Sequence, residues 1–308
     1  MRAQVQLLPD NRRLHLQDGP IDLIVEAFGA PATVKNAYDA AILRFATVLD
    51  ELCGELPLLR RQAAFGNSHP GGAVARRMFD AVLPYCQHIF ITPMAAVAGA
   101  VAEEILHAMT AVAQLDRAYV NNGGDIALHL APGSSFTTAM VDSPDSPAIF
   151  GTALITAAQP IRGIATSGWR GRSFSRGIAD AVTVLAETAA KADAAATVVA
   201  NAVDLPGHSS IARVPARDLA PDSDLGQIPV TREVGKLTAH EIATALEAGA
   251  TVARALASQR LLHSAALHLR GENRVVEFDD RTITCSRAET AALRRPMESN
   301  LDPWSLHA

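Results

Sequence analysis

Hydrophobic and polar positions repeat with two different periods along the first third of the chain, and the change of period marks the expected elements. Val5 to Leu16 and Ile21 to Ala27 have the composition of short strands, separated by a turn at Asp18-Gly19-Pro20. From Ala37 to Leu59, apolar residues recur close to every 3.6 positions, which predicts an amphipathic helix packed on a core. Ala73 to Leu83 predicts a second helix.

The middle of the chain alternates short apolar runs with alanine-rich segments. Met94 to Met109 predicts a helix whose small residues allow close approach of a ligand, although tight packing on a sheet explains the same pattern. Glu187 to Val203 predicts another helix because of its alanine content. The other apolar runs predict strands, namely Ile89 to Ile91, Ala118 to Asn121, Ile126 to Leu130, Ile149 to Ile155, Gly163 to Ala165 and Val182 to Ala186.

The last third opens with a long polar connection, Asp204 to Gly235, that contains four prolines. Thr238 and Glu241 then have the capping-box spacing that begins a helix. Ala265 to Leu269 and Arg274 to Phe278 predict a closing hairpin. The pattern as a whole indicates one α+β domain over residues 1–280, followed by an irregular tail over 281–308 that can serve a partner subunit in a dimer.

Composition restricts the function classes. The chain has 308 residues, of which 49% are hydrophobic and 19% charged, values typical of a folded globular protein. Its longest apolar segments, such as Met94 to Ala102, are shorter than the roughly 20 residues of a membrane span, and no signal layout is visible, so we expect a cytoplasmic protein without a membrane partner. A net charge of −5 favours no nucleic acid. Three distant cysteines indicate neither a disulfide framework nor a thiolate zinc site.

The segment Gly163 to Val203 concentrates the polar features. A glycine-bounded Thr-Ser turn, Thr166 to Gly168, follows an apolar run. Asp193 and Thr197 are four residues apart in an alanine-rich helix, which places both oxygens on one face and lets them offer a carboxylate and a hydroxyl to Mg²⁺. Four arginines without an acidic neighbour lie nearby, at positions 162, 170, 172 and 176, and can clamp a pyrophosphate or form an exposed basic loop.

Two polar features of the sequence, Asp193 and the Gly123-Gly124 pair, each have two interpretations. The partner of Asp193 can be a metal ion or one of the arginines, since an unpaired buried carboxylate would be costly. Gly123 and Gly124, which precede Asp125, can turn their N–H groups toward an anion or form a plain hairpin turn. The dinucleotide fingerprint, the P-loop, HExxH and GxSxG motifs are all missing from the sequence, and its histidines are scattered.

The ordered motifs together resemble the ApbE family, the FAD:protein FMN transferases that use Mg²⁺ to cleave FAD and attach FMN to a Ser or Thr. The resemblance rests on four short segments in the same order, which are Asn121 to Asp125, Ile164 to Gly168, Val182 to Val184 and Ala192 to Thr197. Met94 to Ala100 also resembles the alanine-rich helix of that family. It implies an ApbE-like fold with mixed and antiparallel sheet layers flanked by helices. It also implies metal ligands at Asp193 and Thr197 and a flavin nucleotide site, for FAD or FMN, lined by Ala98, Gly99, Gly123, Gly124, Asp125, Thr166, Ser167 and Gly168.

The chain departs from the transferase pattern at two places. Gly99-Ala100 stands where transferases carry Lys-Gly, and Glu103 and Glu104 follow where they carry an Asp. Arg176 to Asp180 replaces a His-x-x-Asp-Pro segment. The ends of the chain resemble a cytoplasmic branch outside the transferases. We therefore expect Mg²⁺-dependent binding of a flavin nucleotide or related diphosphate, with transferase or pyrophosphatase chemistry. The alternatives are an enzyme for a small anionic or heterocyclic metabolite and a non-catalytic partner of a redox enzyme.

Overall fold

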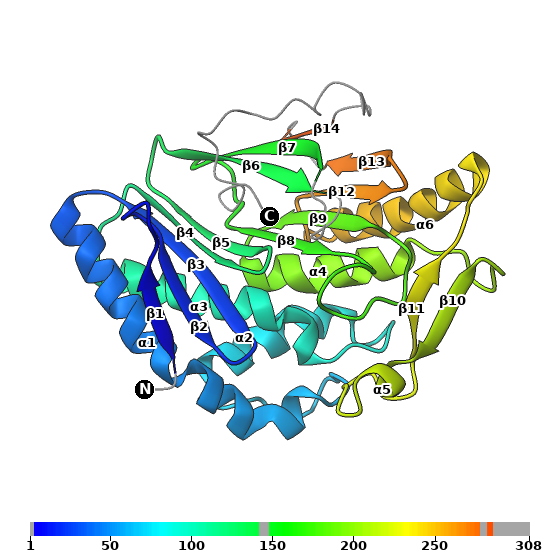
Figure 1. The fold of residues 1–308 in the computed structure, drawn as a ribbon, viewed down its shortest axis with the longest axis horizontal. Helices are drawn as coiled ribbons and strands as arrows, with labels where there is room; N and C mark the ends of the chain where they lie inside the picture. Colours follow the sequence, from blue (N-terminus) through cyan, green and yellow to red (C-terminus); the bar gives the residue numbers. More distant parts are fainter. Residues whose placement is uncertain (1–2, 142–147, 278–281, 286–308) are drawn as a thin grey trace. The chain divides into compact units, whose positions relative to one another are not determined.

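The computed structural model describes residues 3–141, 148–277 and 282–285. Figure 1 shows the fold of the chain. Contacts between residues divide it into two compact units. The first consists of Met1–Ser135, Thr156–Ala165 and Leu185–Ala194, and the second of Phe136–Ile155, Thr166–Val184 and Ala195 onward. The predicted domain end at residue 280 and most of the predicted tail lie outside the described residues.

Unit 1 is built on an antiparallel sheet in which consecutive strands are neighbours. Its strand order is β1-β2-β3-β4-β5-β8. Alternate residues of each strand are buried, so that Leu23, Val25 and Val120 lie on the face that packs against helices. The strands are β1 (Gln4–Leu7), β2 (Leu14–Asp18), β3 (Ile21–Phe28), β4 (Arg117–Asn122), β5 (Asp125–Leu130) and the first residues of β8 (Gly163–Ser167).

The helices of unit 1 cover that face of the sheet (Figure 1). Helix α3 contacts β4 and β5, while α1 contacts β2, β3 and α3. Small residues make the contact of α3 close, since Ala100, Ala102 and Val101 are fully buried. The helices are α1 (Pro31–Leu59), α2 (Ala73–Val82), η1 (Leu83–Tyr85), η2 (Pro93–Ala96), α3 (Val97–Val112) and the start of α4 (Ala189–Ala202).

Unit 2 combines β-hairpins with one long helix. In it β9, β12 and β13 are successive neighbours, β14-β7-β6 form a second antiparallel sheet, and β10 pairs with β11. Helix α6 contacts β12 and β13. Its elements are β6 (Ser135–Val141), β7 (Ile149–Thr156), the end of β8, β9 (Ala181–Ala186), the part of α4 from Ala195 onward, β10 (Ile211–Pro215), α5 (Ala216–Leu219), β11 (Pro229–Val234), α6 (Ala239–Ser258), β12 (Ser264–Leu269), β13 (Glu272–Glu277) and β14 (Ile283–Cys285).

The α+β class and most predicted elements are confirmed, including the capping box of α6 and the β12–β13 hairpin. Three predictions are wrong. Val5 to Leu16 is two strands rather than one, because the Asp10 carboxylate accepts the N–H groups of the two following arginines and closes a turn. Ile89 to Ile91 is not a strand, since Pro93 begins a 3-10 turn directly afterwards. Asp204 to Gly235 contains β10, α5 and β11.

One described stretch, Pro93–Val112, is long and apolar enough to cross a membrane, judged by length and composition alone. Half of its most apolar window is buried inside the protein. Since a core helix passes the same test, and α3 contacts two strands and two helices of unit 1, its apolar composition is explained by packing.

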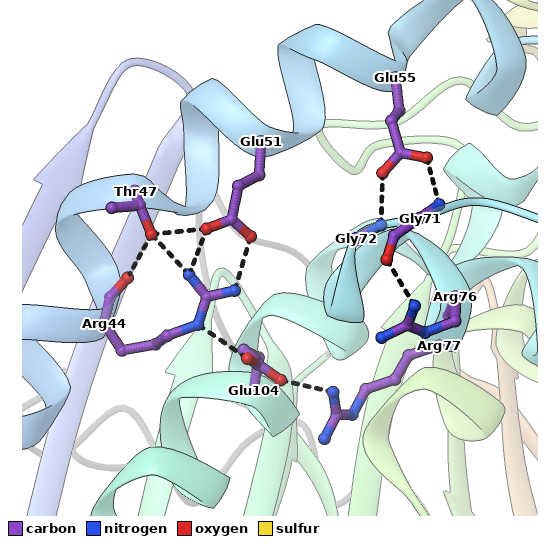
Figure 2. A network of polar contacts seen from close by, with 9 residues as sticks. All are labelled: Arg44, Thr47, Glu51, Glu55, Gly71, Gly72, Arg76, Arg77 and Glu104. Atoms are coloured by element: carbon purple, nitrogen blue, oxygen red, sulfur yellow. Dashed lines mark hydrogen bonds and ion pairs between the residues drawn. The ribbon is translucent and has the colours of Figure 1, made fainter.

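A network of charged side chains joins helices α1, α2 and α3 of unit 1 (Figure 2). The Glu104 carboxylate of α3 accepts hydrogen bonds from Arg44 of α1, at 2.7 Å, and from Arg77 of α2. Arg44 also binds the Glu51 carboxylate through two nitrogens at 2.7 and 2.8 Å. Glu104 is buried, and each of its carboxylate oxygens accepts from one arginine.

We predict that Glu104→Gln lowers the free energy of unfolding by about 3 kcal/mol, because two guanidinium groups then lose their shared buried anion. Glu51→Gln removes the same charge from an exposed partner of Arg44 and should cost less than about 1 kcal/mol. Urea unfolding of both variants measures the difference. Equal losses would show that the network contributes no more than a surface ion pair.

Candidate functional site

The beginning of helix α4 is held between two glycines. A Cβ atom on Gly99 of α3 would lie 2.2 Å from the carbonyl oxygen of Ala189, and one on Gly163 of β8 would lie 2.1 Å from that of Thr188. Both separations are far below van der Waals contact, so each position excludes every side chain. Helix α4 can therefore begin against the first turn of α3, with backbone against backbone.

This close approach brings Asp193 of α4 to the N-terminus of α3. The Asp193 Oδ2 atom accepts the backbone N–H of Gly99 at 3.0 Å, and the carboxylate also accepts the N–H of Ala98. These are among the first N–H groups of α3, which lack acceptors within the helix. Asp193 thus serves as a capping anion for α3, in the favourable direction of the helix dipole.

The opposite arrangement occurs at the N-terminus of α4. Glu103 of α3 accepts the backbone N–H of Ala190 at 3.4 Å, and the Thr188 hydroxyl accepts that of Lys191 at 3.3 Å. Arg77 donates to the other oxygen of Glu103 at 3.1 Å. Each helix therefore supplies a carboxylate to the first turn of the other, and the network of Figure 2 continues through Arg77 to α4.

Burial acts against the charge of Asp193. Desolvation raises its pKa to about 7, and the two hydrogen bonds from Gly99 and Ala98 lower it only in part. Among the described residues, no arginine or lysine pairs with this carboxylate, so the arginine partner considered from the sequence is wrong. Backbone N–H groups take that place.

The β4–β5 hairpin approaches the same turn of α3. Asn122, the last residue of β4, donates from Nδ2 to the carbonyl oxygen of Ala98 at 3.1 Å. Gly123 and Gly124 form the two-residue loop with φ of 67° and 111°, as such a hairpin requires. The Gly124 N–H is taken by the Asn121 Oδ1 atom at 2.8 Å. The hairpin interpretation of the two glycines is therefore correct.

Helix α4 is buried along its middle except at two residues. From Ala192 to Ala200, only Asp193 and Thr197 keep partial access to solvent, and they are one turn apart. The seven residues around them are buried alanines and valines, at most 8% exposed. The polar stripe predicted from their spacing is thus the only open part of this stretch.

Thr166 and Ser167 are the last residues of strand β8 rather than a turn, which corrects the sequence interpretation. The Thr166 hydroxyl lies 2.9 Å from that of Thr183 on β9. Gly168 follows the strand, and a Cβ there would lie 2.2 Å from the carbonyl oxygen of Asp180. These residues belong to unit 2, whereas Ala98, Gly99, the glycine hairpin and Asp193 belong to unit 1.

The arginines predicted to clamp an anion divide into different roles. Arg162 donates to the main-chain carbonyls of Ala157, Gln159 and Ile161 at 2.6 to 2.9 Å and holds that loop in place. The Arg170 guanidinium lies 4.5 Å from the Trp169 ring and faces Asp180 at 3.4 Å. Arg172 and Arg176 are exposed. The four arginines therefore do not form a common phosphate clamp.

Sequence reasoning gave no role to Asn122, Glu103 or Asp180. The Asp180 carboxylate accepts from Trp169 Nε1 at 3.2 Å and from the Arg270 N–H at 2.7 Å, and so ties the loop after β8 to the β12–β13 turn. Alternation along β4 could have indicated Asn122, because Val120, two residues earlier, faces the helices. The contacts of Glu103 and Asp180 depend on tertiary packing and leave no local signal.

The donor atoms around Asp193 suit a small hard cation. No group of three or more His, Cys, Asp or Glu side chains that could hold a metal occurs in the described part of the chain. Mg²⁺ commonly needs only one or two carboxylates, because waters and phosphate oxygens fill its other positions. Asp193 and the Thr197 hydroxyl are oxygen donors of that kind, and the desolvated carboxylate lacks a cationic partner among the described side chains.

The fold and this site define an α+β protein in which a carboxylate caps the helix beside a glycine hairpin. The chain belongs to the family whose model is described as AbpE bacteria, which matches residues 5–275. The resemblance to the ApbE family found in the short motifs is thereby confirmed.

Similar proteins carry the description UPF0280 protein. The UPF0280 protein of Methanopyrus kandleri is 38% identical over 129 residues, which are 42% of this chain and 48% of that protein. The UPF0280 protein of Methanothrix thermoacetophila is 36% identical over 127 residues, which are 37% of this chain and 46% of that protein. The chain thus matches about half the length of these curated relatives.

Solved structures show a weaker likeness. The apo flavinyl transferase ApbE of Pseudomonas stutzeri aligns with a TM-score of 0.42 and 10% identity, covering 90% of this chain and 95% of that one. The flavin transferase ApbE of Vibrio cholerae aligns with a TM-score of 0.37 and 13% identity, covering 89% and 97%.

We predict opposite effects for two glycine-to-alanine substitutions within helices. A Cβ atom added at Gly54 of α1 would have no neighbouring atom within 4 Å. Gly54→Ala should therefore stabilise the protein by about 0.5–1 kcal/mol. Gly99→Ala gains the same helix propensity but forces α3 away from Ala189, and should cost about 1–3 kcal/mol. Thermal unfolding of both variants tests the contact, and a stabilised Gly99→Ala protein would show that the two helices are not so close.

We also predict that Asp193→Asn changes the pH dependence of stability. Since folding raises this pKa from 3.8 to about 7, the uncharged carboxyl stabilises the fold fully below about pH 4, and that contribution is lost as the pH rises to about 7. Asparagine keeps an acceptor for the two N–H groups and does not titrate. In a chelator, the variant should match the wild type near pH 4 and be more stable at pH 8, by at most about 4 kcal/mol. Urea unfolding across this range measures it, and a constant difference would contradict the raised pKa.

Proposed function

We propose that the protein binds a flavin nucleotide, or a related molecule with a diphosphate, together with Mg²⁺ held by Asp193 and Thr197. The observation that carries this proposal is the open stripe of α4, in which these two oxygen donors alone interrupt a buried alanine and valine surface. A desolvated carboxylate with only backbone N–H partners gains most from a cation, because the cation restores the charged form.

The chain's own residues would divide the work. Asp193 and Thr197 would hold the ion, with Ala98 and Gly99 keeping the carboxylate in place through their N–H groups. The missing side chain at Gly99 lets α4 approach the first turn of α3 closely enough for Asp193 to accept these N–H groups. We assign the nucleotide contacts to this turn, to Gly123, Gly124 and Asp125, and to Thr166, Ser167 and Gly168. When bound, Mg²⁺ supplies neutralisation of phosphate charge.

Membership of the family supports a flavin-related role, and the substitutions at Gly99-Ala100 and at Arg176 to Asp180 bear on the chemistry. The reaction classes that such a site serves are transfer of FMN and hydrolysis of the diphosphate. Binding without turnover would instead place the protein among non-catalytic cofactor carriers. An enzyme for a different anionic metabolite would be stabilised thermally by that anion and not by FAD.

Calorimetric titration with FAD, with and without Mg²⁺, tests the proposal. We expect binding that strengthens with Mg²⁺ in the wild type and loses its Mg²⁺ dependence in Asp193→Asn, which keeps the hydrogen bonds but not the charge. Glu187→Gln is the matched control, because it removes one exposed negative charge six residues away. Absence of heat in every titration, with no flavin retained by the purified protein, would refute the proposal.

A further inference from the structure

We infer that Asn122 is a positioning residue for the cation site, an inference that rests on the proposed function. The side-chain amide of Asn122 holds the first turn of α3, and that turn holds the Asp193 carboxylate. The contact that carries the inference is the hydrogen bond of 3.1 Å from Asn122 Nδ2 to the carbonyl oxygen of Ala98.

The peptide group between Ala98 and Gly99 is held from both sides. Its carbonyl oxygen accepts from Asn122, and its N–H, which belongs to Gly99, donates to Asp193 Oδ2 at 3.0 Å. Rotation of this peptide would break both bonds at once. Asn122 and Asp193 therefore act on one rigid group, and the orientation of that group decides where the carboxylate lies.

The sheet leaves Asn122 little freedom to move. It pairs with Leu23 of β3 on one side and with Asp125 of β5 on the other. Asn122 is 8% exposed, so its side-chain amide is enclosed on the helix side of the sheet. Asn121 next to it uses its own side chain for the hairpin loop, through Gly124. The two neighbouring asparagines thus have separate roles.

Only a neutral donor of this size meets the requirements of position 122. The atom that faces Ala98 must donate, because a carbonyl oxygen can only accept. A buried lysine or arginine there would bring a positive charge toward the proposed cation. An aspartate has the same shape as asparagine but would set a carboxylate oxygen against the carbonyl oxygen of Ala98.

The experiment compares Asn122→Asp with Asn121→Asp, the same chemical change on adjacent residues. Mn²⁺ alone is the probe, since it also prefers oxygen ligands and can be counted by electron paramagnetic resonance. Loss of a residue that orients a metal ligand commonly costs 10–100-fold in metal affinity. We expect Asn122→Asp to raise the Kd for Mn²⁺ by about 10-fold or more, although its added negative charge alone would strengthen binding. Asn121→Asp keeps its acceptor for Gly124 and should bind as the wild type does.

A second variant and a second measurement make each result decisive. Asn122→Leu removes the donor without adding charge and should also weaken Mn²⁺ binding. In metal-free protein, the Gly99 amide should lose protection from hydrogen exchange in both Asn122 variants. Unchanged or tighter Mn²⁺ binding by Asn122→Asp, with Gly99 still protected, would overturn the inference. If the wild type and Asp193→Asn both bind no Mn²⁺, the proposed function fails, and the exchange of Gly99 still decides whether Asn122 positions the turn.

Discussion

The close packing of two helix N-termini is the constraint on which the rest of unit 1 depends. Gly99 and Gly163 leave no room for a side chain on either side of the residues that begin α4. Because the helices meet with backbone against backbone, the first turn of each lies within reach of a carboxylate from the other, Asp193 in one direction and Glu103 in the other. N–H groups in the first turn of each helix, which lack acceptors within the helix, are thereby satisfied by carboxylates.

The charged network on the outer helices supports this crossing. Arg77 links the buried Glu104 to Glu103, and Glu103 reaches the start of α4. Glu55 of α1 accepts the N–H groups of Gly71 and Gly72, both at 2.7 Å, and so holds the segment that leads into α2 (Figure 2). Carboxylates that accept backbone N–H groups near the start of a helix thus recur through unit 1. The position of α3 is fixed from its outer side by ion pairs and at its N-terminus by backbone contacts.

Periodicity could predict the elements of this fold but not the contacts that make its site. The apolar repeat of α1 and the capping box of α6 are local signals, and both elements form as expected. The spacing of Asp193 and Thr197 likewise indicated a shared helix face. The partner of Asp193 was beyond reach, because it consists of backbone N–H groups 94 residues earlier in the chain. Thr166 and Ser167 were misassigned since a glycine after a strand was interpreted as a turn boundary.

The balance of charge around Asp193 links the packing to the proposed function. The N-terminus of a helix offers about half a unit of positive charge, which explains why this carboxylate can be buried at all. That half charge is not enough to keep it ionised, because desolvation still raises the pKa to about 7. Asn122 holds the same turn in position through a hydrogen bond but adds no charge to it. Because the residue at position 122 is a neutral amide, it holds the turn without adding a positive charge, and Asp193 is left without a cationic partner among the described side chains, which is the condition on which the proposed function rests.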